Sequence, residues 1–125
     1  MTCKTARWNY LKNLLNNLSS EDFWKEFEQS PDAKILDVRT KDELITGILP
    51  HAIHIDFLGE DFWDRLEQLD KDDIYFVYCN SGRRSIRVCT YMTNGGFQYV
   101  FNLDGGIANL ITDKLVPPEY LEVWD

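Results

Sequence analysis

The run from Ile74 to Cys79 is the feature of this chain that most limits how it can fold. It reads Ile-Tyr-Phe-Val-Tyr-Cys, is rich in β-branched and aromatic residues, and contains neither glycine nor proline. Such a run predicts a strand buried on both faces, as in the centre of a parallel sheet. A polar turn follows, and from Arg84 the apolar residues take a helical spacing that ends at 94–96, namely Ile86, Cys89 and Met92. The sequence therefore predicts a strand, a loop and a helix in succession, with Cys79 at the end of the strand.

Cys79 lies at the start of a loop between a strand and a helix. Such a loop directs its backbone N–H groups, and the positive end of the helix dipole, at the group that lies there. These groups favour an anion, and the thiolate of Cys79 is the anion available. Arg83, Arg84 and Arg87 add positive charge, and one full charge at about 4 Å contributes on the order of 4 kcal/mol at an effective dielectric of about 20. Gly82 fits a loop that must curl around a sulfur atom. We therefore expect Cys79 to be largely ionised at neutral pH; the plainer alternative is a small buried hydrophobic residue that ends a strand.

Several blocks of the chain carry a family resemblance. The block Tyr-Cys-Asn-Ser-Gly-Arg-Arg-Ser at 78–85, followed by a helix and by Gly-Phe-Gln-Tyr-Val-Phe-Asn-Leu-Asp-Gly-Gly-Ile at 96–107, resembles the active-site half of a single-domain rhodanese. The blocks at 35–44 and 47–55 are similar to the N-terminal half of the same family. The resemblance extends from about residue 18 to about residue 110.

This resemblance implies an α/β fold of the rhodanese-like type. It consists of three layers, with a central parallel sheet of about five strands and helices on both faces, and an extra N-terminal helix is expected here in addition. The alternation of predicted strands and helices independently favours a parallel sheet covered on both faces. The chain departs from the family at Ile48 and Leu49, at His51 and at Leu110. We interpret these departures as differences in packing.

With 125 residues, the chain has room for one domain with a sizeable core. We expect an N-terminal helical extension at 1–17, a rhodanese-like domain at 18–112 and a C-terminal tail at 113–125. The extension has apolar residues at a helical spacing, namely Trp8, Leu11, Leu14, Leu15 and Leu18. It is expected to pack on the domain, and binding to a partner is the alternative. In the tail, Tyr120 and Trp124 are candidates to cover the core or another subunit.

The remaining elements are predicted from caps, breakers and periodicity. Ser19 and Ser20 followed by two acidic residues indicate the start of a helix that ends near Pro31. The other predicted segments are a strand at 34–38, a helical turn at 40–45 capped by Thr40, a strand at 52–55, a helix at 56–69 with Phe57, Phe62, Trp63, Leu66 and Leu69 facing inward, a strand at 97–103 and a short helix through Leu110.

Asp37 and Arg39 fall at the carboxyl end of the predicted strand 34–38. In a parallel sheet this end is where ligands bind. The two charges are therefore candidates to lie at the same edge of the sheet as Cys79. The expected role is structural, as a pairing network that holds the loops, and the family resemblance implies the same supporting role.

The two histidines and Cys89 are expected to take no part in catalysis. His51 and His54 are the only histidines, and nothing near them in the sequence supplies a metal-binding set or a paired nucleophile. Cys89 lies on the apolar stripe of the predicted helix and is expected to be a buried core thiol; a resolving partner for Cys79 is the alternative. We expect neither a metal nor a cofactor.

Composition limits the partners. The net charge is −8 and the isoelectric point is about 4.7, which argues against nucleic acid, because binding there is dominated by neutralising phosphates. No apolar run approaches the roughly 18 residues of a membrane span. No hydrophobic signal-peptide core follows Met1, so we expect a cytoplasmic protein with no membrane partner.

The chemistry that we expect is sulfane-sulfur transfer in two steps. The thiolate of Cys79 takes the outer sulfur of a small anion, thiosulfate or a persulfide, and the resulting persulfide passes it to a thiol, or to cyanide in an assay. A protein can also serve as the sulfur donor or acceptor. Arg83 or Arg84 is expected to orient the sulfonate. The loop expected to hold the persulfide anion consists of Asn80, Ser81, Gly82, Arg83, Arg84 and Ser85.

Two other functions stay open at this point. A phosphatase or arsenate reductase uses a similar cysteine loop, but with a longer spacing than the four residues that separate Cys79 from Arg84 here. A non-catalytic binding module of the same fold usually lacks the cysteine, which this chain retains.

Overall fold

The centre of the computed structural model is a parallel sheet of five strands in the order β1-β5-β4-β2-β3. The structure describes residues 16–116 and Leu121. The strands are Asn16–Leu18 (β1), Lys34–Asp37 (β2), Ile53–His54 (β3), Ile74–Tyr78 (β4) and Tyr99–Leu103 (β5). β4 lies in the middle of the sheet, and its residues 75–78 are at most 1% exposed. The prediction of a buried central strand is therefore confirmed.

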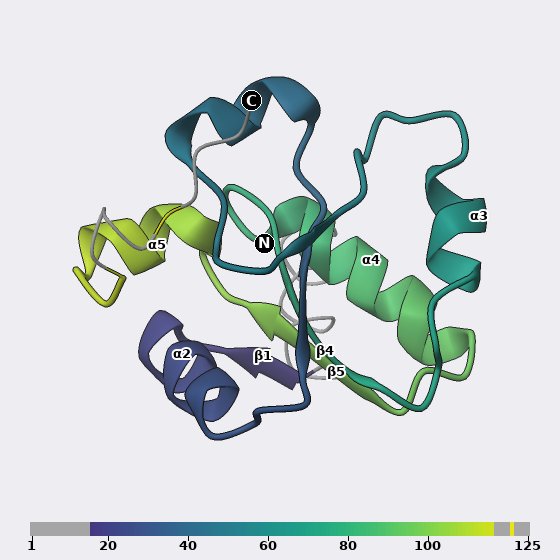
Figure 1. Ribbon diagram of the computed structural model, residues 1–125, viewed down its shortest axis with the longest axis horizontal. Helices are drawn as coiled ribbons and strands as arrows, with labels where there is room; N and C mark the ends of the chain where they lie inside the picture. The colour runs from purple at the N-terminus through teal and green to yellow at the C-terminus, as the bar shows by residue number, and fades with distance from the viewer. Residues whose placement is uncertain (1–15, 117–120, 122–125) are drawn as a thin grey trace, which may run out of the picture.

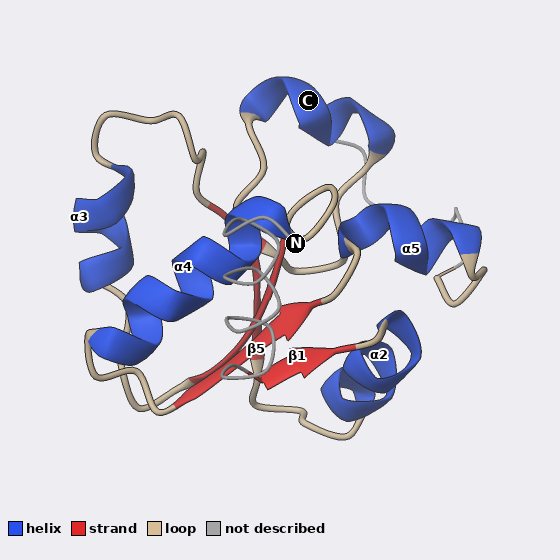
Figure 2. Cartoon of the chain, turned by 180° about the vertical axis from the view of Figure 1, so that it is seen from behind, coloured by secondary structure: helices blue, strands red, loops and turns tan. Residues whose placement is uncertain are grey.

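Helices cover both faces of the sheet (Figures 1 and 2). They are Ser20–Glu28 (α2), Phe62–Glu67 (α3), Arg83–Asn94 (α4) and Gly106–Thr112 (α5), and a 3-10 helix runs over Lys41–Thr46 (η1). α2 and α5 lie on one face, and α3 and α4 lie on the other. η1 stands beyond the carboxyl ends of the strands. The three-layer α/β architecture expected from the sequence is thus the observed one.

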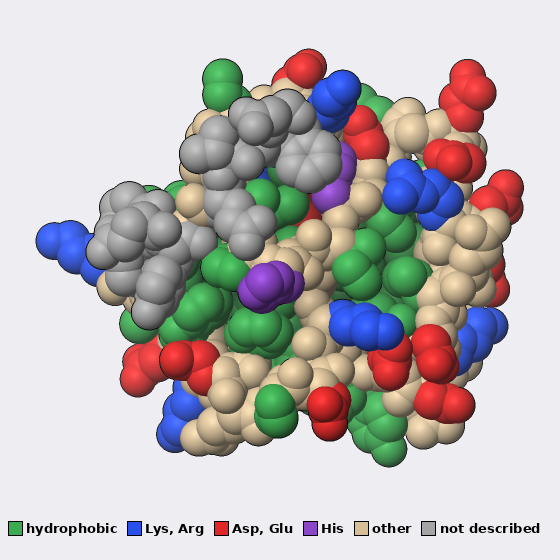
Figure 3. All heavy atoms as spheres, in the orientation of Figure 1, with side chains coloured by type: hydrophobic (Ala, Val, Ile, Leu, Met, Phe, Trp, Pro, Cys, Tyr) green, Lys and Arg blue, Asp and Glu red, His purple; other side chains and the backbone are tan. Residues whose placement is uncertain are grey.

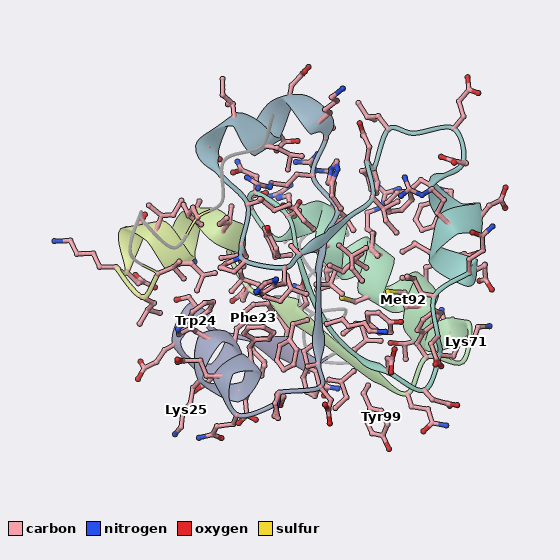
Figure 4. All side chains as sticks on the ribbon, viewed as in Figure 1. Phe23, Trp24, Lys25, Lys71, Met92 and Tyr99 are labelled. Atoms are coloured by element: carbon pink, nitrogen blue, oxygen red, sulfur yellow. The ribbon has the colours of Figure 1, made fainter. Side chains whose placement is uncertain are left out.

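Two hydrophobic clusters hold these layers together, because successive side chains of a strand point to opposite faces. Val77 of β4 belongs to the cluster with Met92 of α4, whereas Phe76 belongs to the cluster with Phe23 of α2. Figure 4 labels Phe23 and Met92, which lie on opposite sides of the sheet. Phe76 meets Phe23 edge-on at 5.3 Å between ring centroids and stacks on Phe101 of β5 at 5.0 Å. Burying one such ring contributes about 1.5–3 kcal/mol.

Capping signals in the sequence set the starts of α2 and η1. The Ser19 hydroxyl accepts a hydrogen bond from the backbone N–H of Asp22 at 3.2 Å, as the helix-start signal predicts. Thr40 precedes η1, and its backbone N–H and hydroxyl both donate to the Glu43 carboxylate, at 3.2 and 2.8 Å. Thr40 and Glu43 therefore form one half of a capping box.

The predicted helix at 56–69 is wrong in its first half. Only Phe62–Glu67 is helical, and Trp63 is 38% exposed instead of facing inward. The reason lies at Asp56, whose carboxylate accepts from the backbone N–H of Leu58 at 2.8 Å and whose carbonyl accepts from Gly59 at 2.9 Å. These bonds close a turn that competes with a helix for the same backbone groups.

The predicted N-terminal helical extension at 1–17 falls mostly outside the described residues, and its last two residues are not helical. Asn16 and Asn17 belong to β1, which pairs in parallel with Phe101–Leu103 of β5. The pairing satisfies backbone groups at that edge of β5. The Asn17 side chain also accepts a hydrogen bond from the amide of Asn102 at 2.7 Å. Leu18, the last residue of the predicted helical spacing, belongs to this strand as well.

At the other end of the chain, α5 runs to Thr112 and Val116 is buried with 2% of its surface exposed. Leu121 packs against the cluster on the α2 side of the sheet. The expectations for Tyr120 and Trp124 lie outside the described residues. Among the residues that the structure describes, no helix has the length and hydropathy needed to cross a membrane.

Candidate active site

Cys79 lies directly after β4 with none of its surface exposed. Its sulfur accepts hydrogen bonds from the backbone N–H groups of Gly82 at 3.1 Å and Ser85 at 3.4 Å, and the Ser85 hydroxyl lies 3.4 Å away. Gly82 has a φ of 93° and precedes the first turn of α4, a conformation that glycine adopts without strain. Of the six residues at 80–85 that were predicted to hold the sulfur, Gly82 and Ser85 thus direct backbone N–H groups at it.

A second glycine turn, which the sequence analysis left without a role, supports this loop from the start of α5. The N–H groups of Ile107 and Ala108 donate to the carbonyls of Cys79 at 2.9 Å and Asn80 at 3.3 Å. Gly106 has a φ of 69°, and a Cβ atom there would lie 2.2 Å from the Asn80 carbonyl oxygen. In the sequence, the signal for this turn was the pair of adjacent glycines, Gly105 and Gly106, that follows the strand. The loop that follows β5 therefore fixes the shape of the loop that follows β4.

Arg84 is held by a residue that the sequence analysis did not single out. Its two terminal guanidinium nitrogens, Nη1 and Nη2, each lie 2.6 Å from a different carboxylate oxygen of Glu43, a residue of η1. The hydrogen bonds from Arg84, together with those from Thr40, lower the pKa of Glu43 to about 2. The three-residue spacing from Thr40 to Glu43 was a signal for a cap, but not for a contact with Arg84. The positive charge of Arg84 is therefore paired with the Glu43 carboxylate.

The other two arginines of the cluster differ from Arg84 in their surroundings. Arg83 and Arg87 are exposed on α4, and the Arg87 guanidinium lies 5.8 Å from the centre of the Phe57 ring. Acidic side chains are numerous along the right-hand edge of the surface in Figure 3, in keeping with the net charge of −8. The cluster at the start of α4 is thus a local positive region on an acidic chain.

Asp37 and Arg39 form a fully buried ion pair whose nearest atoms are 2.8 Å apart. Arg39 also donates to the carbonyls of Gly47 at 2.7 Å and Glu43 at 3.2 Å, and to the Thr46 hydroxyl at 3.1 Å. A buried guanidinium is stable only when its N–H groups are satisfied in this way. The pair ties β2 to the middle of η1 and to its C-terminal end, an arrangement that fits the supporting role expected for it.

Neighbouring residues complete the support. Tyr78 precedes Cys79, and its hydroxyl accepts from the backbone N–H of Leu49 at 3.1 Å. Burial raises the pKa of Tyr78 well above its ordinary value, so the phenol stays neutral. The His54 ring lies 2.8 Å from the Arg39 carbonyl, and His51 has a φ of 61° in the preceding turn.

Cys89 is buried with 1% exposed, and burial raises the pKa of its thiol strongly. It packs in the same hydrophobic cluster as Cys79, and both cysteines are free. The prediction of a buried core thiol is therefore confirmed. Among residues 16–116 and Leu121, no three His, Cys, Asp or Glu side chains gather in a way that could hold a metal ion.

These features define a class of protein, an α/β domain that presents a cysteine in a tight loop between a central strand and a helix. The model of the rhodanese-like domain matches residues 19–112. The chain is 36% identical over 93 residues to a putative sulfurtransferase, YtwF, of Bacillus subtilis, a match that spans 74% of this chain and 87% of that protein. The chain belongs to the rhodanese-like domain family.

Two further comparisons show the range of the family. A tRNA uridine(34) hydroxylase of Legionella pneumophila is 32% identical over 112 residues, which span 86% of this chain but 42% of that longer protein. The crystal structure of a rhodanese-like domain protein from Staphylococcus aureus superposes with a TM-score of 0.72 at 26% identity, over 89% of this chain and all of that one. The domain is thus similar both to a protein that consists of little else and to part of a larger protein.

Proposed function

We propose that this protein is a sulfurtransferase that carries sulfane sulfur on Cys79. The observation that supports the proposal most directly is the pair of backbone N–H groups, from Gly82 and Ser85, that donate to the Cys79 sulfur. Such donors stabilise a thiolate, and they would stabilise a persulfide anion in the same loop. The likeness to a relative named as a putative sulfurtransferase supports the same reaction.

In the first step the thiolate of Cys79 attacks the outer sulfur of thiosulfate. An S–S bond forms between the enzyme and that sulfur, the S–S bond of thiosulfate breaks, and sulfite leaves with the bonding electron pair. In the second step a thiolate or cyanide attacks the terminal sulfur of the Cys79 persulfide and releases the thiolate of Cys79. The scheme uses no external oxidant, since the sulfur only changes its partner.

The remaining loop residues take supporting roles in this proposal. Asn80 and Ser81 are exposed and would meet an approaching donor, and Arg83 orients the sulfonate group of the donor. Asp37 and Arg39 hold η1 and the loop in place without touching the substrate. A persulfide on a small thiol or on a carrier protein would serve as donor by the same chemistry. Since free thiols persist in a reducing compartment, we place the reaction in the cytoplasm.

The tight loop favours sulfur chemistry over phosphate or arsenate chemistry. The backbone N–H groups of Gly82 and Ser85 lie within 3.4 Å of a single sulfur atom, and Gly82 packs against the next loop, where an added Cβ would lie 3.0 Å from Gly105 N. A tetrahedral oxyanion needs several donors spread over a wider ring. The loop suits one additional sulfur atom better than a phosphoryl group.

The test is thiocyanate formation from thiosulfate and cyanide, measured for the wild type beside Cys79→Ser and, as a matched control, Cys89→Ser. We expect activity in the wild type and in the control, and its loss in Cys79→Ser. Mass spectrometry of the wild type after thiosulfate alone should show one added sulfur on the peptide that contains Cys79. Absence of both activity and added sulfur in the wild type would refute the proposal and favour the binding module.

A further inference from the structure

The Glu43–Arg84 ion pair sits at the side of the candidate active site and joins two elements that are far apart in the sequence. Glu43 comes from η1 and Arg84 from the first turn of α4. The pair is bidentate, with both N···O distances at 2.6 Å, and its side chains are 28% and 27% exposed. Such fork-to-fork geometry is the strongest form of this contact and fixes the plane of the guanidinium.

Arg84 is also near Cys79, because the backbone N–H of the next residue, Ser85, lies 3.4 Å from the Cys79 sulfur. The hydrogen bonds that Arg84 donates to Glu43 are the largest cause of its raised pKa, and attraction to the Cys79 sulfur also raises it. The Glu43 carboxylate therefore neutralises a charge that would otherwise act on the sulfur and on any anion next to it. What holds the sulfur directly is the backbone, through the N–H groups of Gly82 and Ser85.

We propose that Glu43 is a positioning residue that sets which sulfur donor the site prefers, by compensating the charge of Arg84. With Arg84 paired, the loop has one positive charge fewer for a dianion such as thiosulfate. A donor with a single charge on its reacting sulfur, such as the persulfide of a small thiol, loses less from this compensation. The natural donor is therefore of the persulfide class, an inference that rests on the proposed sulfurtransferase function.

The chain offers a matched pair of substitutions to test this role. Glu43→Gln removes the charge, yet its amide oxygen can still accept the hydrogen bonds that Thr40 now donates to the carboxylate at 3.2 and 2.8 Å. Asp42→Asn removes the same formal charge from the adjacent residue, which is exposed on η1 and does not belong to the ion pair with Arg84. Both variants are checked by circular dichroism and thermal unfolding before use.

The first readout is binding of thiosulfate by calorimetry to Cys79→Ser and to the same variant with Glu43→Gln or Asp42→Asn added. Freeing Arg84 makes a charge-assisted hydrogen bond available to the ligand, so we expect thiosulfate to bind on the order of tenfold tighter with Glu43→Gln. Asp42→Asn should change the affinity by less than about twofold, because exposed charges at a distance are screened. Equal effects of the two substitutions, or no effect of Glu43→Gln, would overturn the proposal.

The second readout is steady-state transfer to cyanide from thiosulfate and from glutathione persulfide, in the background that retains Cys79. Glu43→Gln should lower KM for thiosulfate by roughly the same tenfold factor and change KM for glutathione persulfide much less. An equal change for both donors would show that Glu43 has only a structural role. If the wild type transfers sulfur from neither donor, the sulfurtransferase function itself fails, whereas the binding experiment still decides whether Glu43 compensates Arg84.

Discussion

The α-carbon of Gly106 lies so close to the backbone of Asn80 that a Cβ atom would stand 2.2 Å from the Asn80 carbonyl oxygen. The two residues belong to different loops, one after β5 and one after β4. Their contact is between backbones, so neither loop can shift without the other. The hydrogen bond from Ile107 N–H to the Cys79 carbonyl, at 2.9 Å, binds the same two loops. The shape of the loop around the sulfur thus depends on a glycine more than twenty residues further along the chain.

Gly106→Ala should therefore damage both stability and sulfur transfer. The overlap forces one of the two loops to move, and we expect a loss of about 2–4 kcal/mol in the free energy of unfolding together with at least a tenfold fall in kcat/KM. Urea unfolding and the cyanide assay measure the two quantities. Gly96→Ala is the matched control, because Gly96 also has a positive φ, 98°, but its added Cβ would have no neighbour closer than 3.9 Å. It should cost about 1 kcal/mol and leave the activity in place; similar losses in the two variants would contradict the role given to the backbone contact.

Arg39→Lys should destabilise the domain although the charge is kept. Lysine cannot reproduce the planar set of N–H groups with which Arg39 reaches Asp37, Gly47 and Thr46. We expect a loss of about 2–4 kcal/mol in the free energy of unfolding, because buried carbonyl groups and a buried carboxylate lose partners. Arg65→Lys, at an exposed position of α3, should change it by less than about 0.5 kcal/mol. A wild-type unfolding curve for Arg39→Lys would show that the pair does not hold η1.

The Glu43–Arg84 pair predicts a dependence of stability on pH. The pKa of Glu43 is about 2 in the folded protein and 4.5 ordinarily, so the folded state favours the carboxylate. The pair then contributes fully above the ordinary pKa, and its contribution falls as the pH drops toward about 2. At pH 7 we expect Glu43→Gln to lower the free energy of unfolding by about 1–3 kcal/mol.

Urea unfolding of the wild type and of Glu43→Gln at several values between pH 7 and pH 3 measures this difference. It should stay nearly constant down to about pH 5 and shrink only as the pH falls below the ordinary pKa of 4.5. Asp42→Asn serves again as control, and its difference from the wild type should stay small throughout. A gap between the wild type and Glu43→Gln that is the same at every pH would contradict the lowered pKa of Glu43.

Cys89 should resist alkylation in the folded protein. It is 1% exposed, and burial raises the pKa of its thiol, so both access and ionisation disfavour reaction with iodoacetamide at pH 7.5. Peptide mass mapping should find Cys89 unmodified in native protein and modified in urea. Cys79 is just as buried, but it should be labelled earlier, because two backbone N–H groups donate to its sulfur and favour the nucleophilic form. If Cys89 is labelled as fast as Cys79 in native protein, the hydrophobic cluster around it opens more readily than its packing implies.

Much of the fold and of the candidate site was predictable because the relevant signals are local. The apolar run that forms β4, the helical spacing of α4 and the serine that caps α2 each act within a few residues of themselves. The failures also have local causes. The side chain of Asp56 closes a turn where the apolar pattern favoured a helix. At Asn16–Leu18, the helical spacing of apolar residues predicted a helix, but the chain forms β1. In both places a competing use of backbone hydrogen bonds outweighed the pattern.

The sequence by itself determined that Cys79 ends a buried strand, that Gly82 and a helix follow it, and that the sheet is parallel. These features arise from backbone conformation and from the period of apolar residues, which neighbouring residues dictate. Only the tertiary structure decided that Glu43 neutralises Arg84. The same holds for the backbone contact between Gly106 and Asn80 and for the hydrogen bonds of Arg39 that hold η1. Such contacts join loops that meet because the carboxyl ends of parallel strands share one edge of the sheet, and no spacing along the chain encodes which side chains meet there.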